Sequence, residues 1–93
     1  MIITFRCKET EQIFKRHISK KFSQNLQPRA RTKLLMLDSA TDLDDLRIPP
    51  ANRLENLKGD RKGQQSIRIN NQWRICFVWK DNNAYEVEIV DYH

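Results

Sequence analysis

Apolar and polar side chains alternate along the last third of the chain, residues 64–93. From Trp73 to Lys80 the large apolar residues occupy every second position, which is the period of a β-strand with one buried face. Arg74 and its alternate neighbours then face the other way. The same alternation appears in residues 66–70 and 85–90, and its apolar members are Ile67, Ile69, Tyr85, Val87 and Ile89.

Polar joints separate these three runs. The segments 70–72 and 81–83 are rich in asparagine and aspartate, as hairpin connections are. The pattern therefore predicts an antiparallel meander. Its last strand leads into Asp91, Tyr92 and His93. A carboxylate, a phenol and an imidazole are therefore adjacent at the end of the chain, where the stability of a fold seldom requires such side chains. This ending is the strongest indication of function in the sequence.

A helical pattern lies in the N-terminal part of the chain. Phe14, Ile18 and Phe22 recur at a spacing of four residues, with Ile13 beside them. They predict a first helix that includes His17 as a partly exposed side chain.

A second helix is predicted with Pro28 in its first turn, a position that proline tolerates. One face of this helix is apolar, and a further two apolar residues widen it: Ala30, Leu34 and Leu37, with Leu35 and Met36. We expect this helix to be the one most buried against the sheet.

Shorter segments complete the predicted α+β fold. Residues 2–5 are apolar and partly β-branched, which favours an edge strand of the same sheet. A short helix is expected to begin at a cap near Thr41 or Asp42. Gly59 and Gly63 bracket a tight basic turn before the first long strand.

Length and composition indicate one soluble globular domain spanning residues 1–93. Hydrophobic residues make up 39% of the chain and charged residues 31%, and no apolar run is long enough to cross a bilayer. The first residues lack the pattern of a secretory signal, so the cytoplasm is the expected compartment, without contact with a membrane. Cys7 and Cys76 have no metal-like spacing and are expected to be free thiols.

The net charge is +5, and it is distributed unevenly. Residues 1–37 contain nine Lys or Arg and two Glu, which gives this part a charge of +7. Two explanations are open. The charges could be the solvated faces of two helices, or they could be the electrostatic contact surface for a nucleic acid.

The polar residues of the predicted sheet suggest acid–base chemistry supported by cations. Arg68 and Arg74 share a face, while Glu55 and Lys58 lie on the segment that leads into it. The sequence has neither a metal-ligand pattern nor a glycine-rich nucleotide loop, so no metal and no cofactor are expected. RNA suits such a site because its 2′-hydroxyl supplies an internal nucleophile. Alternatively, the two arginines could form cross-strand pairs with glutamates at 86 and 88 above a frayed terminus.

Several of these stretches carry a family resemblance over essentially the whole chain. The run 53–63, which contains Leu-Lys-Gly-Asp-Arg, the strand 66–70, the start of the strand at Trp73 and the ending Asp91-Tyr92-His93 resemble the HigB toxins of the RelE superfamily. The resemblance implies a RelE-like α+β fold, with N-terminal helices packed on a twisted antiparallel sheet.

The resemblance also implies a function. Such toxins belong to type II toxin–antitoxin pairs, enter the ribosomal A site and cut the mRNA there without a metal. A HigA-type antitoxin with a helix-turn-helix domain holds them inactive. The expected partners are therefore this antitoxin, the ribosome and mRNA, and operator DNA only through the antitoxin.

The site residues follow from the resemblance by position. Arg74 matches the phosphate-binding arginine, and Lys58 matches a basic residue near the substrate. Arg68 and Arg61 are expected to bind substrate beside them. The catalytic residues are expected to be those at the chain end together with one carboxylate: Asp91, Tyr92, His93 and Glu55.

One departure from the family pattern affects the mechanism. Some members have a histidine where this chain has Glu55. Either Glu55 or Asp91 would then take the 2′-hydroxyl proton while His93 protonates the leaving oxygen, and His93 as the base is the alternative. Tyr92 would stack on a base or orient it.

Two other classes of function compete with an endoribonuclease. A toxin of the same fold could poison DNA gyrase by binding, although the Asp91-Tyr92-His93 ending argues against it. A plain RNA- or ribosome-binding module with an inert terminus is the other alternative.

Overall fold

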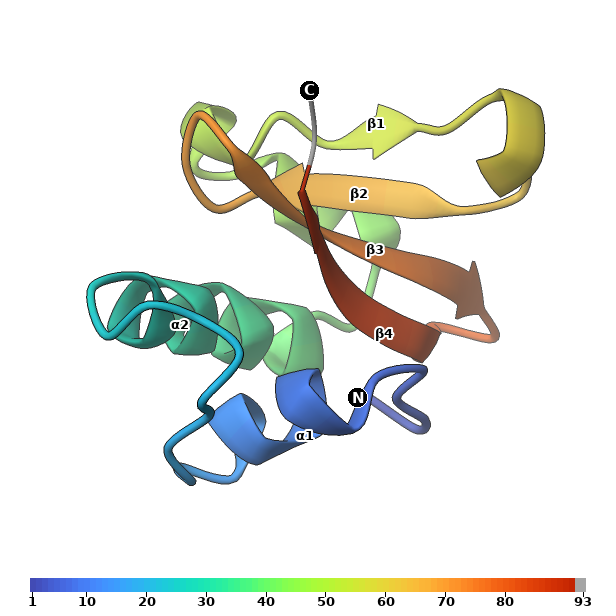
Figure 1. Ribbon diagram of the computed structural model, residues 1–93. Helices are drawn as coiled ribbons and strands as arrows, with labels where there is room; N and C mark the ends of the chain where they lie inside the picture. Colours follow the sequence, from blue (N-terminus) through green and yellow to red (C-terminus); the bar gives the residue numbers. More distant parts are fainter. Residues whose placement is uncertain (92–93) are drawn as a thin grey trace.

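The computed structural model describes residues 1–91 as two helices beside a four-stranded sheet (Figure 1). The helices are α1 (Lys8–Phe14) and α2 (Leu26–Ser39), and the strands are β1 (Glu55–Asn56), β2 (Gln65–Arg68), β3 (Trp73–Lys80) and β4 (Asn83–Asp91). Three short 3-10 helices lie between them: η1 (Leu43–Arg47), η2 (Pro50–Asn52) and η3 (Gly59–Arg61). The sheet order is β1-β2-β3-β4 and all pairs are antiparallel, so the predicted α+β class and meander are confirmed.

The hairpin joints have the backbone conformation that their residues favour. Asp81 and Asn82 both have positive φ, at 53° and 61°, which is the geometry of a tight two-residue hairpin turn. At the preceding joint, the Asn70 side chain accepts hydrogen bonds from the backbone N–H groups of Gln72 and Trp73 at 2.9 and 2.8 Å. Both connections were predicted from the sequence.

The apolar core lies between the helices and one face of the sheet. Ile67, Ile75 and Ile89 are direct cross-strand neighbours on this inner face, and each is at most 5% exposed. The predicted inward residues of α2, which are Ala30, Leu34 and Leu37, are fully buried against it. Leu35 is 39% exposed, so the expected widening of this face is wrong there.

A β-bulge in β4 corrects the predicted alternation. Tyr85 pairs with Val78 and Glu88 pairs with Cys76, so two residues of β4 lie opposite the single residue Phe77. Glu86, one of these two, has a φ of +54°. Because the bulge shifts the side-chain period by one residue, Tyr85 lies on the face opposite to Val87.

The first predicted helix extends too far. The structure ends α1 at Phe14, Arg16 adopts a φ of +65°, and Ile18 is 83% exposed. His17 is exposed but lies in the following loop and not in a helix. Phe22 is buried, as its apolar character suggested, because its ring meets that of Trp73 edge-on at 5.5 Å.

Polar contacts hold this loop in its non-helical path. The Gln27 side chain accepts a hydrogen bond from the Ser19 N–H at 3.1 Å and donates to the carbonyls of Ser19 and Phe22, both at 2.8 Å. The Ser19 hydroxyl donates to Glu9 at 2.9 Å. These contacts replace the helical hydrogen bonds that the spacing of the apolar residues suggested.

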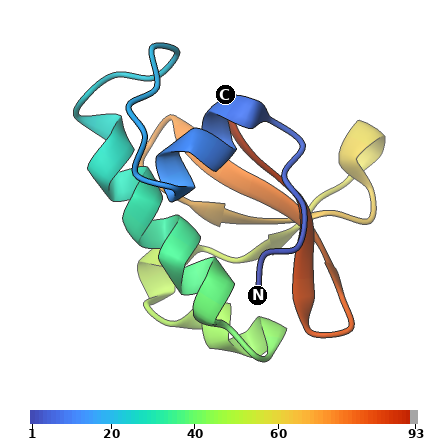
Figure 2. The same cartoon turned by 90° about the horizontal axis from the view of Figure 1, so that it is seen from below.

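The N-terminal segment runs parallel to β4 and covers its free edge (Figure 2). Ile2 bridges to Ala84 and Phe5 bridges to Val87, and the Ile3 N–H donates to the Ala84 carbonyl at 2.8 Å. The predicted edge position is therefore confirmed, although the pairing consists of isolated bridges.

The connection between α2 and the sheet follows its capping signals. Asp42 accepts a hydrogen bond from the Asp44 N–H at 2.9 Å, and Asp45 accepts one from the Asp42 N–H at 3.1 Å, which forms a capping box for η1. Gly59, with a φ of +65°, opens the basic turn. In the described part of the chain, no helix is long and apolar enough to span a membrane.

Candidate functional site

Arg74 occupies the middle of the sheet face that points away from the helices. It lies on β3 between the partly buried Trp73 and the fully buried Ile75, and it is itself only 4% exposed. Its Nε donates to the Ser66 hydroxyl at 2.8 Å, and its Nη2 donates to the carbonyls of Arg53 at 2.6 Å and Ser66 at 3.3 Å. These bonds fix the plane of the guanidinium.

The surroundings of Arg74 differ from a solvated sheet face. Among the described residues, Glu55 is a carboxylate neighbour of Arg74, at 3.8 Å between Nη2 and Oε1. Glu88 pairs instead with Arg61 at 2.8 Å and lies 3.9 Å from Arg6. The alternative of a cross-strand pair between Arg74 and Glu88 is thus replaced by two separate ion-pair groups.

A pocket of about 250 Å³ opens beside this guanidinium. Its lining is strongly polar and comes from the β1 entry, the end of β2 and the β2–β3 hairpin: Arg53, Glu55, Arg68, Asn70, Asn71 and Arg74. Folding thus brings together three of the residues expected from the sequence. A polar pocket with three arginines is suited to an anion, because guanidinium groups bind phosphate oxygens in a bidentate manner.

A second pocket, of about 320 Å³, adjoins the first at Glu55. It is lined by Glu55, Asn56, Leu57, Lys58 and Arg61. Lys58 and Arg61, the other expected substrate-binding residues, therefore lie beside the same glutamate. Glu55 thus borders both pockets, and its carboxylate lies 3.8 Å from the Arg74 guanidinium.

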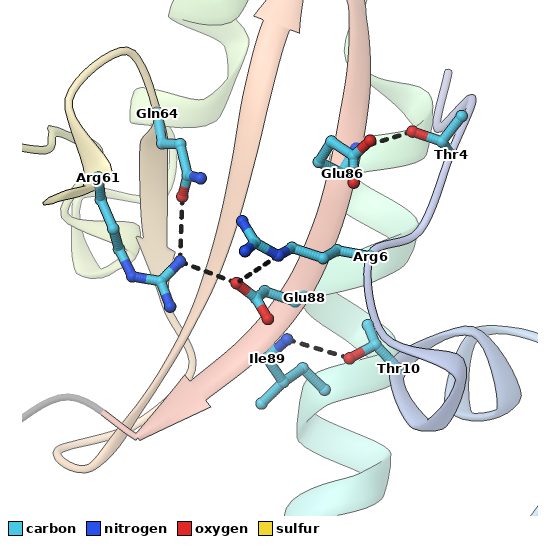
Figure 3. A network of polar contacts seen from close by, with 8 residues as sticks. All are labelled: Thr4, Arg6, Thr10, Arg61, Gln64, Glu86, Glu88 and Ile89. Carbon is cyan, nitrogen blue, oxygen red and sulfur yellow. Dashed lines mark hydrogen bonds and ion pairs between the residues drawn. The ribbon is translucent and has the colours of Figure 1, made fainter.

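Arg61 has a structural contact as well as a place in this lining. Figure 3 shows its side chain reaching across the outer face to Glu88, with Gln64 beside it. The hydrogen bond to the Glu88 carboxylate raises the pKa of Arg61. The contact ties the turn that contains η3 to the far strand β4.

Cys76 lies beneath these charges and does not act as a nucleophile. Burial raises the pKa of its thiol, and the nearby guanidinium groups of Arg61 and Arg74 oppose that rise only in part. A protonated, 1% exposed thiol is chemically inert. Both cysteines are free, as expected, although Cys7 is only half-buried.

Asp91 ends β4, next to the row that contains Arg74. It pairs with Trp73, so its register position belongs to the opposite face from Arg74. Its carboxylate accepts a hydrogen bond from the Gln72 side chain at 3.1 Å. Among the described residues, neither pocket includes Asp91 in its lining. The expected catalytic residues Tyr92 and His93 lie outside the described residues.

Part of the pocket was not predicted from the sequence. Arg53 has a left-handed φ of +46°, and its carbonyl anchors Arg74. Asn70 and Asn71 were interpreted only as hairpin residues, although they also line the pocket. The signal available in the sequence was the pair of asparagines that precedes the strand containing Arg74.

Comparison with known proteins gives a consistent family assignment. Residues 3–93 match the model of a family described as the RelE-like toxin of type II toxin–antitoxin system HigB. The chain is 41% identical over 87 residues to Toxin HigB-1 of Vibrio cholerae, covering 90% of each chain. It is also 31% identical over 93 residues to Endoribonuclease HigB of Proteus vulgaris, covering all of both.

Solved structures share the fold at low sequence identity. A chain of the heterotetrameric YoeB–YefM toxin–antitoxin complex from Staphylococcus aureus aligns with a TM-score of 0.61 at 17% identity, covering 100% of this chain and 98% of that one. A YafQ mutant from E. coli aligns with a TM-score of 0.61 at 14% identity, covering 98% and 93%. These similarities support the α+β arrangement described above.

Proposed function

This chain belongs to the HigB-like family of RelE-like toxins of type II toxin–antitoxin systems, and from that membership we propose that it is a ribosome-dependent endoribonuclease. It cuts mRNA in the ribosomal A site, needs no metal for the chemistry, and thereby inhibits translation. The named activity of its relative from Proteus vulgaris supports the reaction class.

The observation that carries this proposal is the pocket around Arg74. The guanidinium is buried, oriented by Ser66 and Arg53, and bordered by Arg68 and the Glu55 carboxylate. A fixed cation in a water-poor site stabilises negative charge that develops on a phosphate during transfer. A site built only for sheet stability would not need an arginine here.

RNA cleavage at this pocket requires little from the protein besides proton transfer and positioning. The 2′-hydroxyl attacks the adjacent phosphorus, the bond to the 5′-oxygen breaks, and a 2′,3′-cyclic phosphate remains. Arg74 holds the phosphate, with Arg68 and Lys58 beside it. Glu55 takes the 2′-hydroxyl proton, since it borders both pockets and lies 3.8 Å from Arg74.

The remaining roles belong to the chain end. His93 protonates the departing 5′-oxygen, because an imidazole can donate a proton near neutral pH. Tyr92 orients or stacks on a base of the codon. Asp91, which lies on the strand next to this site, positions the chain end through its contact with Gln72.

The test is cleavage of a defined mRNA on programmed ribosomes, with a chelator present and 5′ ends mapped by primer extension. We expect cuts within the A-site codon that need the ribosome and disappear when His93 is deleted. Absence of cleavage by the intact chain would contradict the proposal. The gyrase and binding-module alternatives would then be tested by a supercoiling assay and by ribosome binding.

The family assignment implies an antitoxin partner, and we propose a HigA-type protein with a helix-turn-helix domain. Its acidic residues would complement the charge of +7 on residues 1–37. Contact with operator DNA would then occur only through this partner. The toxin would act in the cytoplasm, where ribosomes and mRNA are found. Co-purification of the two proteins, followed by operator binding with and without the toxin, tests this pairing.

A further inference from the structure

A third pocket, also lined by cations, adjoins the pocket of Arg74, and Arg68 lines both of them. It has a volume of about 210 Å³ and lies between α2 and the end of β2. Its lining residues are Arg29, Thr32, Lys33, Ala51, Arg68 and Ile69. The end of β2 is accessible there because the short strand β1 pairs only with Gln65 and Ser66.

The ammonium of Lys33 is held in place by a buried amide. Lys33 Nζ donates to Asn52 Oδ1 at 2.5 Å, and Asn52 is fully buried. The Asn52 amide nitrogen donates to the carbonyls of Leu46 at 3.1 Å and Ile48 at 3.4 Å. These two bonds orient the amide so that its oxygen faces Lys33. A long side chain that is ordered in advance loses less entropy when a ligand binds.

No carboxylate of residues 1–91 forms an ion pair with a cation of this pocket, Arg29, Lys33 or Arg68. Burial is the main cause that lowers the pKa of Lys33, and the charges of Arg29 and Arg68 lower it further because like charges repel. An anion in the pocket would relieve this repulsion. Arg29 and Lys33 lie one turn apart on α2, and folding brings Arg68 of β2 next to them.

We propose that the pocket of Arg29, Lys33 and Arg68 binds a backbone phosphate of RNA and extends the substrate site from Arg74 onto α2. This inference rests on the proposed function, because it assumes that RNA occupies the adjoining pocket. Arg68 links the two positions, so an RNA strand with one phosphate at Arg74 can place another at Lys33. The bound phosphate belongs either to the mRNA beside the cut codon or to ribosomal RNA.

The test compares two double variants that lower the net charge equally. Arg29→Gln with Lys33→Gln removes cations of the pocket. Lys8→Gln with Lys80→Gln removes exposed lysines that line neither pocket. Binding is measured to ribosomes without mRNA and to ribosomes carrying an mRNA with a 2′-deoxy nucleotide at the cut position, so that cleavage does not interfere.

We expect the pocket variant to bind programmed ribosomes about tenfold more weakly than the wild type. Its affinity should also depend less on salt. The slope of log binding constant against log salt concentration should be shallower by about 0.7 for each single-strand phosphate that the variant no longer neutralises. Weakening confined to ribosomes with mRNA assigns the phosphate to the mRNA. Equal weakening without mRNA assigns it to ribosomal RNA. Affinities equal to those of the control double variant would overturn the inference.

Cleavage of unmodified mRNA by the wild-type chain separates this inference from the proposed function. If the wild type cuts and the pocket variant binds like the control, only the phosphate pocket on α2 is wrong. If the wild type does not cut, the proposed function itself fails. Lys33→Arg provides a further check, because a cation at this position should restore most of the affinity.

Discussion

The two faces of β3 are buried to a similar degree, but by different kinds of atoms. On the inner face, Ile75 and Phe77 are fully buried in the apolar core. On the outer face, Arg74 and Cys76 are 4% and 1% exposed, and the neighbours of Arg74 within residues 1–91 include a hydroxyl, two carbonyls and a carboxylate. Burial alone therefore does not distinguish a core from a site. The polarity of the neighbouring atoms does.

The energetic consequences of the two faces should differ accordingly. Apolar burial of Phe77 stabilises the fold because it removes hydrocarbon surface from water. Burial of the Arg74 charge is costly and has to be offset by hydrogen bonds and by opposite charge. We therefore expect substitutions on the inner face to change mainly stability and those on the outer face to change mainly activity.

The largest expected effect is on the inner face. Phe77→Ala should lower the free energy of unfolding by about 3–5 kcal/mol, because it leaves a cavity in the core. Urea denaturation measures this change. Val78→Ala is the control and should cost clearly less, because Val78 lies at the next position on the outer face and is itself only half-buried. Equal destabilisation by the two variants would contradict the distinction between the faces.

On the outer face, Arg74→Lys should reduce the rate of ribosome-dependent cleavage by about 100-fold, since a lysine cannot reproduce the planar, hydrogen-bonded guanidinium. Single-turnover cleavage of a programmed mRNA measures the rate. Arg47→Lys is the matched control, because Arg47 is exposed and pairs with Asp44 at 3.0 Å in η1. A cleavage rate close to that of the wild type would remove Arg74 from the catalytic site.

Glu55→His tests the proposed base on the same face. A carboxylate is a weaker base than an imidazole near neutral pH, so the variant should cleave about tenfold faster. The same single-turnover assay gives the rate. Asp60→His places a histidine in the neighbouring turn and should leave the rate unchanged. A slower Glu55→His variant would count against Glu55 as the base.

The smallest effect concerns the ion pair that spans the outer face. Glu88→Gln should lower the free energy of unfolding by about 0.5 kcal/mol, because the pair with Arg61 is partly exposed. Thermal unfolding at low and high salt measures it, and the difference from the wild type should shrink as salt rises. Glu86→Gln, at an exposed position on the same strand, is the control.

Sequence pattern was sufficient where local period and tertiary packing agree. The meander, its asparagine turns and the inward face of α2 were all predicted, because alternation and helical spacing record which residues must be buried. The prediction from the apolar pattern was wrong between residues 15 and 22. There the apolar spacing favoured a helix, but hydrogen bonds from Gln27 to Ser19 and Phe22 hold a loop that exposes Ile18.

The bulge at Glu86 could not be predicted for a related reason. Nothing in the alternation of β4 marks the extra residue, and only the pairing with β3 shows that Tyr85 changes face. The Thr4 hydroxyl accepts a hydrogen bond from the Glu86 N–H at 2.8 Å (Figure 3). A residue at the other end of the chain thus helps to fix this irregularity.

The candidate site, too, was predicted from the sequence only in part. Arg74, Arg68 and Glu55 were expected together, and the structure places all three at one pocket. The carbonyl of Arg53 that orients Arg74 could not be expected, since it depends on a left-handed backbone conformation. Lys33 appeared in the sequence only as one charge of a basic helix.

Local period, composition and short motifs were enough to predict the sheet, the second helix, the basic N-terminal part and the resemblance to the toxin family. The burial of Arg74, the position of Glu55 at two pockets and the pocket that Lys33 shares with Arg68 became visible only in the folded chain. The physical reason is that period and composition act between near neighbours in the chain. Burial, ion pairing and pocket shape depend on which strands and helices meet, and on their register.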